Sequence, residues 1–310
     1  MMVTILLPVL ISLRPLQWLK NLAVFAAILF SGVFFDQGYF WPAFFAFWIF
    51  NILSSAMYLV NDVIDIENDK IHIYKRHRPV ASGSVQKRTA LFFSGFLTLV
   101  GLYFAYLLSN PFFITAVIFV VVQISYNLYL KHVILLDIIT IAITFMLRIF
   151  AGSFVVVVPL SSWLILTTMM LSLFLATGKR RSELTLLTNE HAGKFRETLY
   201  HYPARLLDGI TFIMASATLI TYSLFTFNEL ELQSKDFIIA YLPQTLVSPK
   251  WLMATIPLVV YGILRYLYLI FEETGEDSPE KILVKDIPLL ITTLLWFLSV
   301  IAVIYFFPSR

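Results

Sequence analysis

The stretch IPLLITTLLWFLSVIAVIYFF at residues 287–307 decides the fold class, because it contains no charged residue. A helix that crosses a bilayer needs about 20 mostly apolar residues. Windows of similar character lie at residues 18–36, 39–61, 89–108, 111–130, 133–157, 160–178, 208–228 and 251–271. The sequence therefore predicts an all-α integral membrane protein, a bundle of nine transmembrane helices that forms a single domain over residues 1–310.

Composition supports this interpretation, since 59% of the 310 residues are hydrophobic and only 13% are charged. A soluble domain has about 25% charged residues, so this chain has too few charges to cover a surface in water. The absence of cysteine excludes disulfide and thiol chemistry. The net charge of +3 gives no indication of a nucleic-acid partner.

The amino-terminal segment is apolar at residues 3–13 but is too short to span a bilayer. It lacks the basic start and the small-residue cleavage site of a removable signal peptide. We therefore expect residues 1–17 to lie at the membrane interface, with transmembrane helices over residues 18–307.

Positive charges are distributed unequally between the two ends of the predicted bundle. With nine helices, 17 of the 22 Lys and Arg residues fall on the side of the amino terminus and of the loops after every second helix. The positive-inside rule makes this side cytoplasmic. The sequence predicts a multi-pass protein of the cell (inner) membrane whose active site, with its polar cap loops, faces the cytoplasm.

An acidic run, NDVIDIEND at residues 61–69, follows the second predicted helix. On a continuing helix Asn61, Asp62, Asp65 and Asp69 would share one face, because they are three or four residues apart. Carboxylates this close repel one another unless a cation lies between them, and oxygen ligands with added phosphates suit magnesium. The spacing favours a magnesium–diphosphate site; the alternative is a solvated acidic helix end.

Three further groups of polar residues lie on the same side. His72, Lys75, Arg76 and Arg78 follow the acidic run and could bind the phosphate oxygens that a metal leaves free. Lys179, Arg180 and Glu183 end the sixth predicted helix, and one carboxylate among cations suits an anionic phosphosugar. For both groups the alternative is an ordinary topology signal.

The third group comprises Tyr126, Lys131, Asp137 and Arg148. Asp137 and Arg148 fall inside the fifth predicted helix, where ionisable residues are costly and usually face a cavity or a partner. They are about three helical turns apart, so both could line one face without a mutual salt bridge. In the alternative, each binds another helix and holds the bundle together.

Several of these runs carry a resemblance to a known family. NDVIDIENDKIH and YKRHRPVASG, at residues 61–72 and 74–83, resemble the N-D-x-x-D-x-x-x-D and K-R-x-R-P-x-A-x-G signature of the UbiA superfamily of intramembrane prenyltransferases. Usual members carry a second aspartate-rich motif after helix 6, where this chain has KRRSEL. Ile73 and Tyr74 also stand where the family commonly has Pro and Thr.

The departure at KRRSEL indicates one branch, the decaprenyl-phosphate phosphoribosyltransferases. The runs that resemble this branch cover residues 14–21, 53–62, 126–137, 146–153, 178–184 and 278–290, with the sequences RPLQWLKN, LSSAMYLVND, YNLYLKHVILLD, MLRIFAGS, GKRRSEL and SPEKILVKDIPLL. They extend over nearly the whole chain, and together they are specific.

The resemblance implies a reaction in which 5-phosphoribose passes from phosphoribosyl pyrophosphate to a polyprenyl phosphate and diphosphate is released. It implies Mg²⁺ as cofactor, held by Asn61, Asp62, Asp65 and Asp69, with the three aspartates as catalytic residues. It implies phosphate binding by Lys20, Lys75, Arg76, Arg78, Lys131, Lys179 and Arg180. The remaining expected substrate-binding residues are Asn21, Tyr58, His72, Tyr126, Asp137, Arg148 and Glu183, the last for a ribose hydroxyl or a second metal.

In the branch, the product is a precursor of lipid-linked arabinose donors of the cell envelope. Two alternatives stay open: a prenyltransferase of the same superfamily with a prenyl diphosphate donor, and a transporter without catalysis. A homo-oligomer also stays open, because no motif decides assembly.

Overall fold

The computed structural model describes residues 8–71, 75–189, 202–228, 250–272 and 278–306, all helices and connections with no strand among them. Eight helical segments in these ranges are long and apolar enough to cross a membrane. They are α3 (Gln37–Ile64), α5 (Lys87–Leu108), α6 (Asn110–Leu128), α7 (Leu136–Val156), α8 (Ser162–Asn189), α10 (Ala204–Asn228), η4 with α12 (Trp251–Thr255, Ile256–Phe271) and α14 with η5 (Ile287–Ile301, Ala302–Phe306). The all-α membrane fold is confirmed.

The predicted count of nine spanning helices is not confirmed. The first window forms a shorter helix, Pro15–Phe30, in which the 3-10 segment η1 (Pro15–Phe25) leads into α2 (Ala26–Phe30). A 3-10 helix rises about 2.0 Å per residue against about 1.5 Å in an α-helix, so this segment reaches further through the bundle than its residue count suggests. The interfacial position of residues 1–17 stays a prediction.

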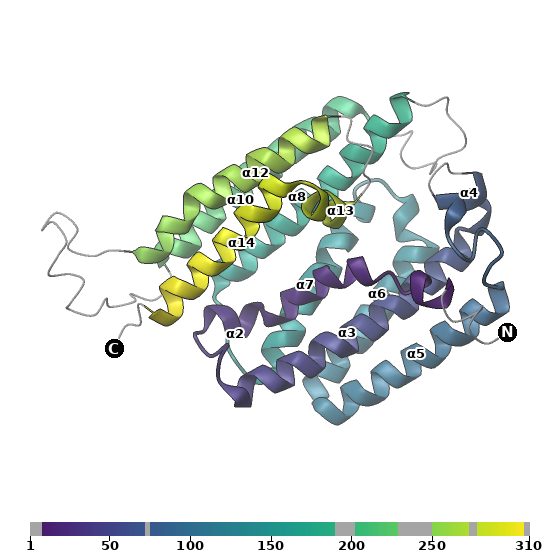
Figure 1. Cartoon of the computed structure of the whole chain (residues 1–310), viewed down its shortest axis with the longest axis horizontal. Coiled ribbons are helices and arrows are strands. Elements are labelled where there is room, and N and C mark those ends of the chain that lie inside the picture. Colours follow the sequence, from purple (N-terminus) through teal and green to yellow (C-terminus); the bar gives the residue numbers. More distant parts are fainter. Residues whose placement is uncertain (1–7, 72–74, 190–201, 229–249, 273–277, 307–310) are drawn as a thin grey trace, which may run out of the picture.

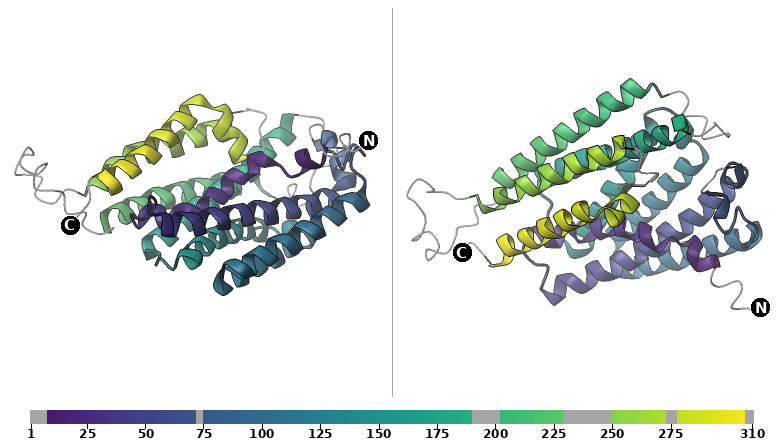
Figure 2. Two further views of the ribbon diagram at one scale, coloured as in Figure 1. Left: turned by 60° about the horizontal axis from the view of Figure 1, so that its bottom comes forward. Right: turned by 45° about the horizontal axis from the view of Figure 1, so that its top comes forward.

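The helices form two groups that lie side by side (Figures 1 and 2). The helices α3, α5, α6 and α7 surround one buried cluster, in which the Phe50 ring contacts those of Phe112 and Phe119 at centroid distances of 5.7 and 5.1 Å. The helices α8, α10, α12 and α14 surround two others. Contacts between α7 and α8 join the groups.

The outer surface is apolar, as a lipid-facing surface must be. Only 17% of the apolar window of α5 is buried, and Phe92 and Leu99 on this helix are exposed. Exposed side chains of this kind would promote aggregation in water, but they are stable in contact with lipid hydrocarbon.

Helix η1 lies against α7 at a contact that needs a glycine. A Cβ atom on Gly152 would lie 2.0 Å from the backbone oxygen of Val24. No side chain fits at that distance, so glycine lets the two backbones approach. This contact sets how deeply η1, with Lys20 and Asn21, lies in the first group of helices.

One end of the bundle collects the short polar elements. There α3 is followed by α4 (Ile66–Ile71) and η2 (Lys75–His77), and α6 by η3 (Leu130–His132). The helix α13 (Pro279–Lys285) precedes α14 and contacts η1 and α8. Figure 1 shows α4 at this end of the bundle.

Candidate active site

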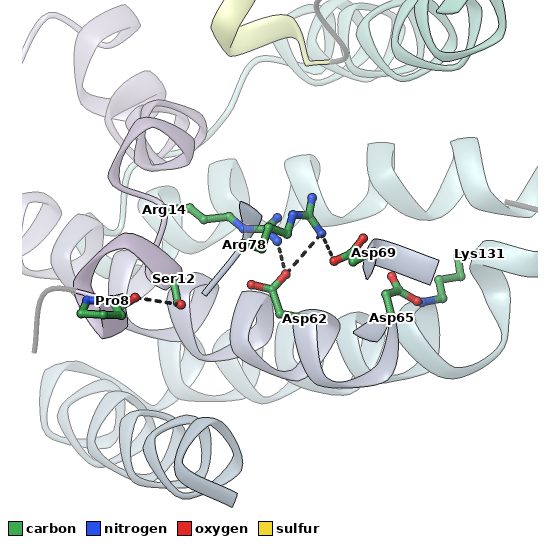
Figure 3. Close-up of polar contacts among 8 residues, drawn as sticks. All are labelled: Pro8, Ser12, Arg14, Asp62, Asp65, Asp69, Arg78 and Lys131. Atoms are coloured by element: carbon green, nitrogen blue, oxygen red, sulfur yellow. Dashed lines mark hydrogen bonds and ion pairs between the residues drawn. The ribbon is translucent and has the colours of Figure 1, made fainter. Parts of the chain in front are cut away.

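The acidic run does not continue as one helix, and this expectation was wrong. Helix α3 ends at Ile64, Asp65 caps it with a non-helical ψ of 9°, and α4 starts at Ile66. Because the chain turns at Asp65, the carboxylates no longer form a single stripe. Asp62 and Asp69 face Arg78, while Asp65 faces Lys131 (Figure 3).

The first part of the site is a set of ion pairs around Asp62. Its Oδ1 atom accepts hydrogen bonds from Arg14 and, at 3.3 Å, from Arg78. The same Arg78 nitrogen donates to Asp69 Oδ2 at 2.6 Å, so one guanidinium bridges two buried carboxylates. The Arg14 guanidinium also lies over the Tyr58 ring, 5.0 Å from its centroid. Residues from the N-cap of η1, from α3, from α4 and from the segment after η2 thus meet at one point.

Arg14 shares Asp62 with a second guanidinium, that of Arg78. Burial, together with the neighbouring charge of Arg78, lowers its pKa below the ordinary value, although Asp62 acts in the opposite direction. Two guanidinium groups held this close are stabilised by further negative charge, which phosphate oxygens would supply.

Lys131 forms the second part of the site. Its side chain is 1% exposed, and its Nζ atom donates to Asp65 Oδ1 at 2.5 Å. Lys131 comes from η3, directly after α6, so the ion pair ties the end of α6 to the end of α3. A buried lysine beside a carboxylate can exchange that partner for a phosphate group without losing its compensation.

The residues expected to hold magnesium have suitable chemistry. Asp62 Oδ2 is buried and has no hydrogen-bond partner among the described residues, which makes it an available hard oxygen donor. Asp69 lies within reach of the same Arg78 nitrogen, and Asn61 is in the last turn of α3. The described residues contain no group of three His, Cys, Asp or Glu that could hold a metal alone. Magnesium usually takes one or two carboxylates and completes its shell with phosphates and water, so a pair is sufficient.

The third part of the site is a buried network on Arg180. This side chain donates to Asp137 Oδ2 at 2.6 Å, to Glu183 Oε2 at 2.5 Å and to the Tyr126 hydroxyl at 2.9 Å. Tyr202 donates to Asp137 Oδ1 at 2.6 Å. Burial, followed by this hydrogen bond, raises the pKa of Tyr202, so its hydroxyl stays a donor at neutral pH. Asp137 on α7 therefore pairs with another helix, through Arg180 on α8.

Arg148 does not pair with Asp137. Their separation of about three turns on α7 predicted that they would not form a salt bridge. Its Nε atom donates to Asn21 Oδ1 at 2.6 Å, another nitrogen donates to the Thr144 carbonyl, and the guanidinium lies over the Phe119 ring. Asn21 donates in turn to Asn51 Oδ1 at 2.6 Å. Among the described residues, no carboxylate forms an ion pair with this buried cation.

Lys20 has a partner that the sequence did not suggest. Its Nζ atom lies 2.9 Å from Glu280 Oε1, so η1 is tied to α13 across the site. Lys179 is half-buried on α8, and its charge acts on Glu280. Two of the expected phosphate-binding lysines therefore flank one carboxylate from the carboxyl-terminal part of the chain.

Two other expected residues, Lys75 and Arg76, belong to the short element η2. Lys75 is half-buried in η2, and Arg76 is exposed with a hydrogen bond to His77 at 3.3 Å. His72 lies outside the described residues.

Sequence reasoning missed Arg14, Tyr202 and Glu280 as members of the site. Arg14 opens the run RPLQWLKN, so its signal was present but was attributed to topology. Glu280 likewise lies in a quoted run, SPEKILVKDIPLL at residues 278–290, but was not singled out from it. For Tyr202 no local signal was identified.

Comparison with known proteins agrees with this architecture. Residues 21–285 match the model of the UbiA prenyltransferase family. A decaprenyl-phosphate phosphoribosyltransferase of Mycolicibacterium smegmatis is 33% identical over 299 residues, which cover 95% of this chain and 92% of the relative. One of Corynebacterium glutamicum is 31% identical over 96% of this chain and 86% of the relative.

A UbiA homolog from Archaeoglobus fulgidus, solved with GPP and Mg²⁺ bound, superposes with a TM-score of 0.67. The alignment covers 96% of this chain and 99% of that one at 19% identity, which establishes a shared fold. The family model and the curated relatives extend the agreement to the sequence over nearly the whole chain. This chain therefore belongs to the UbiA prenyltransferase family.

Proposed function

We propose that this protein transfers 5-phosphoribose from phosphoribosyl pyrophosphate to a polyprenyl phosphate, at the cytoplasmic face of the cell membrane. The observation that carries the proposal is the charge of the KRRSEL run, residues 179–184 of α8. Where usual family members have a second set of aspartates, Glu183 is the one carboxylate of the KRRSEL run, and it is bound to Arg180. Cations suit the phosphates of a phosphosugar better than they suit a second metal.

The donor would bind through its two anionic ends. Asp62 and Asp69, with Asn61 beside them, would hold Mg²⁺, and Asp65 would join them on the side of Lys131. When bound, Mg²⁺ neutralises charge on the diphosphate as it departs. Arg14, Arg78 and Lys131 supply the hydrogen-bond donors around it. Lys20 and Lys179 stand on the other side of the site, near Glu280.

The transfer balances without a general base. An oxygen of the lipid phosphate forms a bond to the anomeric carbon of ribose, and the bond from that carbon to the diphosphate oxygen breaks. The leaving diphosphate takes the electron pair. Because the attacking phosphate is already anionic at neutral pH, no proton has to be removed, and the residues serve to bind, orient and neutralise charge.

The test uses radiolabelled phosphoribosyl pyrophosphate, polyprenyl phosphate and purified full-length protein with magnesium. Label should enter the lipid phase with wild-type protein and should be lost with Asp65→Asn or with a chelator. Glu67→Gln is the matched control, since Glu67 lies two residues away, is 83% exposed and pairs with Lys70 on the surface. Its activity should be unchanged.

Two other results would replace the proposal. Product from a prenyl diphosphate donor, with none from phosphoribosyl pyrophosphate, would establish the prenyltransferase alternative. Substrate flux through vesicles that persists in Asp65→Asn, without any product, would establish a transporter.

A further inference from the structure

Three buried polar atoms at the junction of α12 and α13 have no hydrogen-bond partner among the described residues. They are the hydroxyls of Tyr266 and Ser278 and the Oε2 atom of Glu280. The three residues are only 4%, 7% and 6% exposed, respectively. Buried polar groups are nearly always paired, because an unpaired one loses its hydration without compensation. Three unpaired buried polar atoms in this region indicate a site for a polar ligand.

The residues that carry the three atoms lie in one region of the structure, where α13 begins and α12 packs on α8. Glu280 and Ser278 are two residues apart at the start of α13, and the charge of Glu280 acts on Tyr266. Tyr266 packs directly on α8: a Cβ atom on Gly178 would lie 2.8 Å from its ring and 3.0 Å from its hydroxyl. Glycine at position 178 therefore leaves room for the phenol beside Lys179. The three atoms define a polar cluster, Tyr266–Ser278–Glu280, between α8, α12 and α13.

The cluster adjoins the proposed phosphate-binding residues. Lys20 from η1 binds the other oxygen of Glu280 at 2.9 Å, and the Lys179 charge also acts on this carboxylate. Burial by itself would raise the pKa of Glu280, but the Lys20 ammonium, assisted by Lys179, more than offsets it and lowers that pKa. Glu280 is thus an ionised hydrogen-bond acceptor at neutral pH.

The chemistry of the cluster restricts its ligand. A single carboxylate with two hydroxyls is a poor metal site, and its negative charge opposes a phosphate oxygen. An ionised carboxylate accepts hydrogen bonds from hydroxyl groups, and serine and tyrosine hydroxyls both donate and accept. Sugar hydroxyls have matching donors and acceptors.

We propose that Glu280, with Ser278 and Tyr266, binds the ribose hydroxyls of the phosphoribosyl donor. This inference rests on the proposed function and names the residues by which the site recognises its donor as a sugar. A prenyl chain has no hydroxyl, so it would leave Oε2 of Glu280 buried without a hydrogen-bond partner, and a site built to bind a hydroxyl rejects analogues that lack it. A purely structural role, the tie from α13 to Lys20, accounts for Oε1 but not for the three unpartnered atoms.

The test compares phosphoribosyl pyrophosphate with its 2-deoxy and 3-deoxy analogues as donors, using full-length protein with magnesium and polyprenyl phosphate. Wild-type protein should prefer the natural donor over at least one analogue by about tenfold or more, the value of a hydrogen bond to a charged group. In Glu280→Gln, kcat/KM for the natural donor should fall, and the preference should shrink toward one. Ser278→Ala keeps the Lys20–Glu280 pair and should shrink the preference in the same direction.

Asp286→Asn is the matched control. Asp286 lies six residues beyond Glu280 and is likewise held by a cation, Arg265, at 2.7 Å, but it lies outside the cluster. This variant should keep the full preference. An equal loss with natural and deoxy donors in both Glu280→Gln and Ser278→Ala would overturn the inference and leave the proposed function standing. Failure of wild-type protein to label any lipid would overturn both.

Discussion

Arg180 and Asp137 form a fully buried ion pair, with the Arg180 Nε atom 2.6 Å from Asp137 Oδ2 and both side chains 1% exposed. The pair joins α8 to α7, and these two helices connect the two groups of the bundle. Removal of one partner of a buried pair leaves the other charge without compensation, although Arg180 would still keep Glu183. The relationship therefore predicts a large effect on stability.

Asp137→Asn should lower the free energy of unfolding by about 3 kcal/mol, the lower end of the range for a broken buried pair, because Glu183 remains. Asp208→Asn breaks the neighbouring pair with Arg181, whose partners are 18% and 32% exposed. We expect it to cost less, about 1 kcal/mol, because both partners remain accessible to water, which weakens the pair. Unfolding in mixed detergent micelles, followed by tryptophan fluorescence, measures both. Equal losses of unfolding free energy in the two variants would contradict the prediction that burial makes the Asp137–Arg180 pair more important for stability.

Arg78→Lys should raise the KM for the donor by about tenfold, because an ammonium group cannot reproduce the planar contacts of a guanidinium that bridges Asp62 and Asp69. Arg88→Lys, an exposed position at the start of α5, should leave the KM within experimental error. Steady-state transfer assays at saturating lipid phosphate separate the two. An unchanged KM in Arg78→Lys would show that this bridge does not contribute to donor binding.

Gly152→Ala should destabilise the protein by about 1–3 kcal/mol, the usual penalty for forcing atoms into a packed interior. The new methyl group would meet the Val24 backbone oxygen at 2.0 Å, so η1 would have to move away from α7. Gly95→Ala on α5 is the control, since its Cβ would have no neighbour within 4 Å. There alanine should be neutral or stabilising, because it restricts the unfolded chain. A neutral Gly152→Ala would mean that η1 shifts freely.

The stability that Glu280 adds should depend on pH in a defined direction. Lys20 holds the pKa of folded Glu280 below its ordinary value despite burial, so the ionised carboxylate stabilises the folded state. That contribution is present above the pKa of the unfolded chain and is lost as pH falls through the folded pKa. Wild-type protein should therefore unfold at a higher temperature than Glu280→Gln at pH 7. The difference should be constant down to about pH 5 and shrink below the ordinary pKa of 4.5. If the difference in unfolding temperature instead grew as the pH fell, the pKa of folded Glu280 would lie above its ordinary value, which would contradict the prediction.

Several properties of this protein follow from the sequence alone. The length and composition of apolar windows predicted the membrane fold, since the thickness of a bilayer is a fixed local requirement. Whether one window, residues 18–36, spans the bilayer stays a prediction, because its 3-10 segment has a different rise from the α-helix that the length rule assumes. The spacing of Asn61, Asp62, Asp65 and Asp69 identified the residue types of the site but not their orientation, because the helix break at Asp65 is not visible in the spacing.

What the tertiary structure alone decided is which charges meet. From the sequence, Asp137 could equally face a cavity or bind a neighbouring helix. In the structure its partner is Arg180, which comes from the next helix, α8. Lys20 and Glu280 are 260 positions apart, and no local pattern relates them. In a low-dielectric interior each charge must find a partner, but the partner is set by which helices pack together. The sequence determines the membrane fold, the helices and the types of side chain in the site. Helix packing determines which charged side chains form ion pairs.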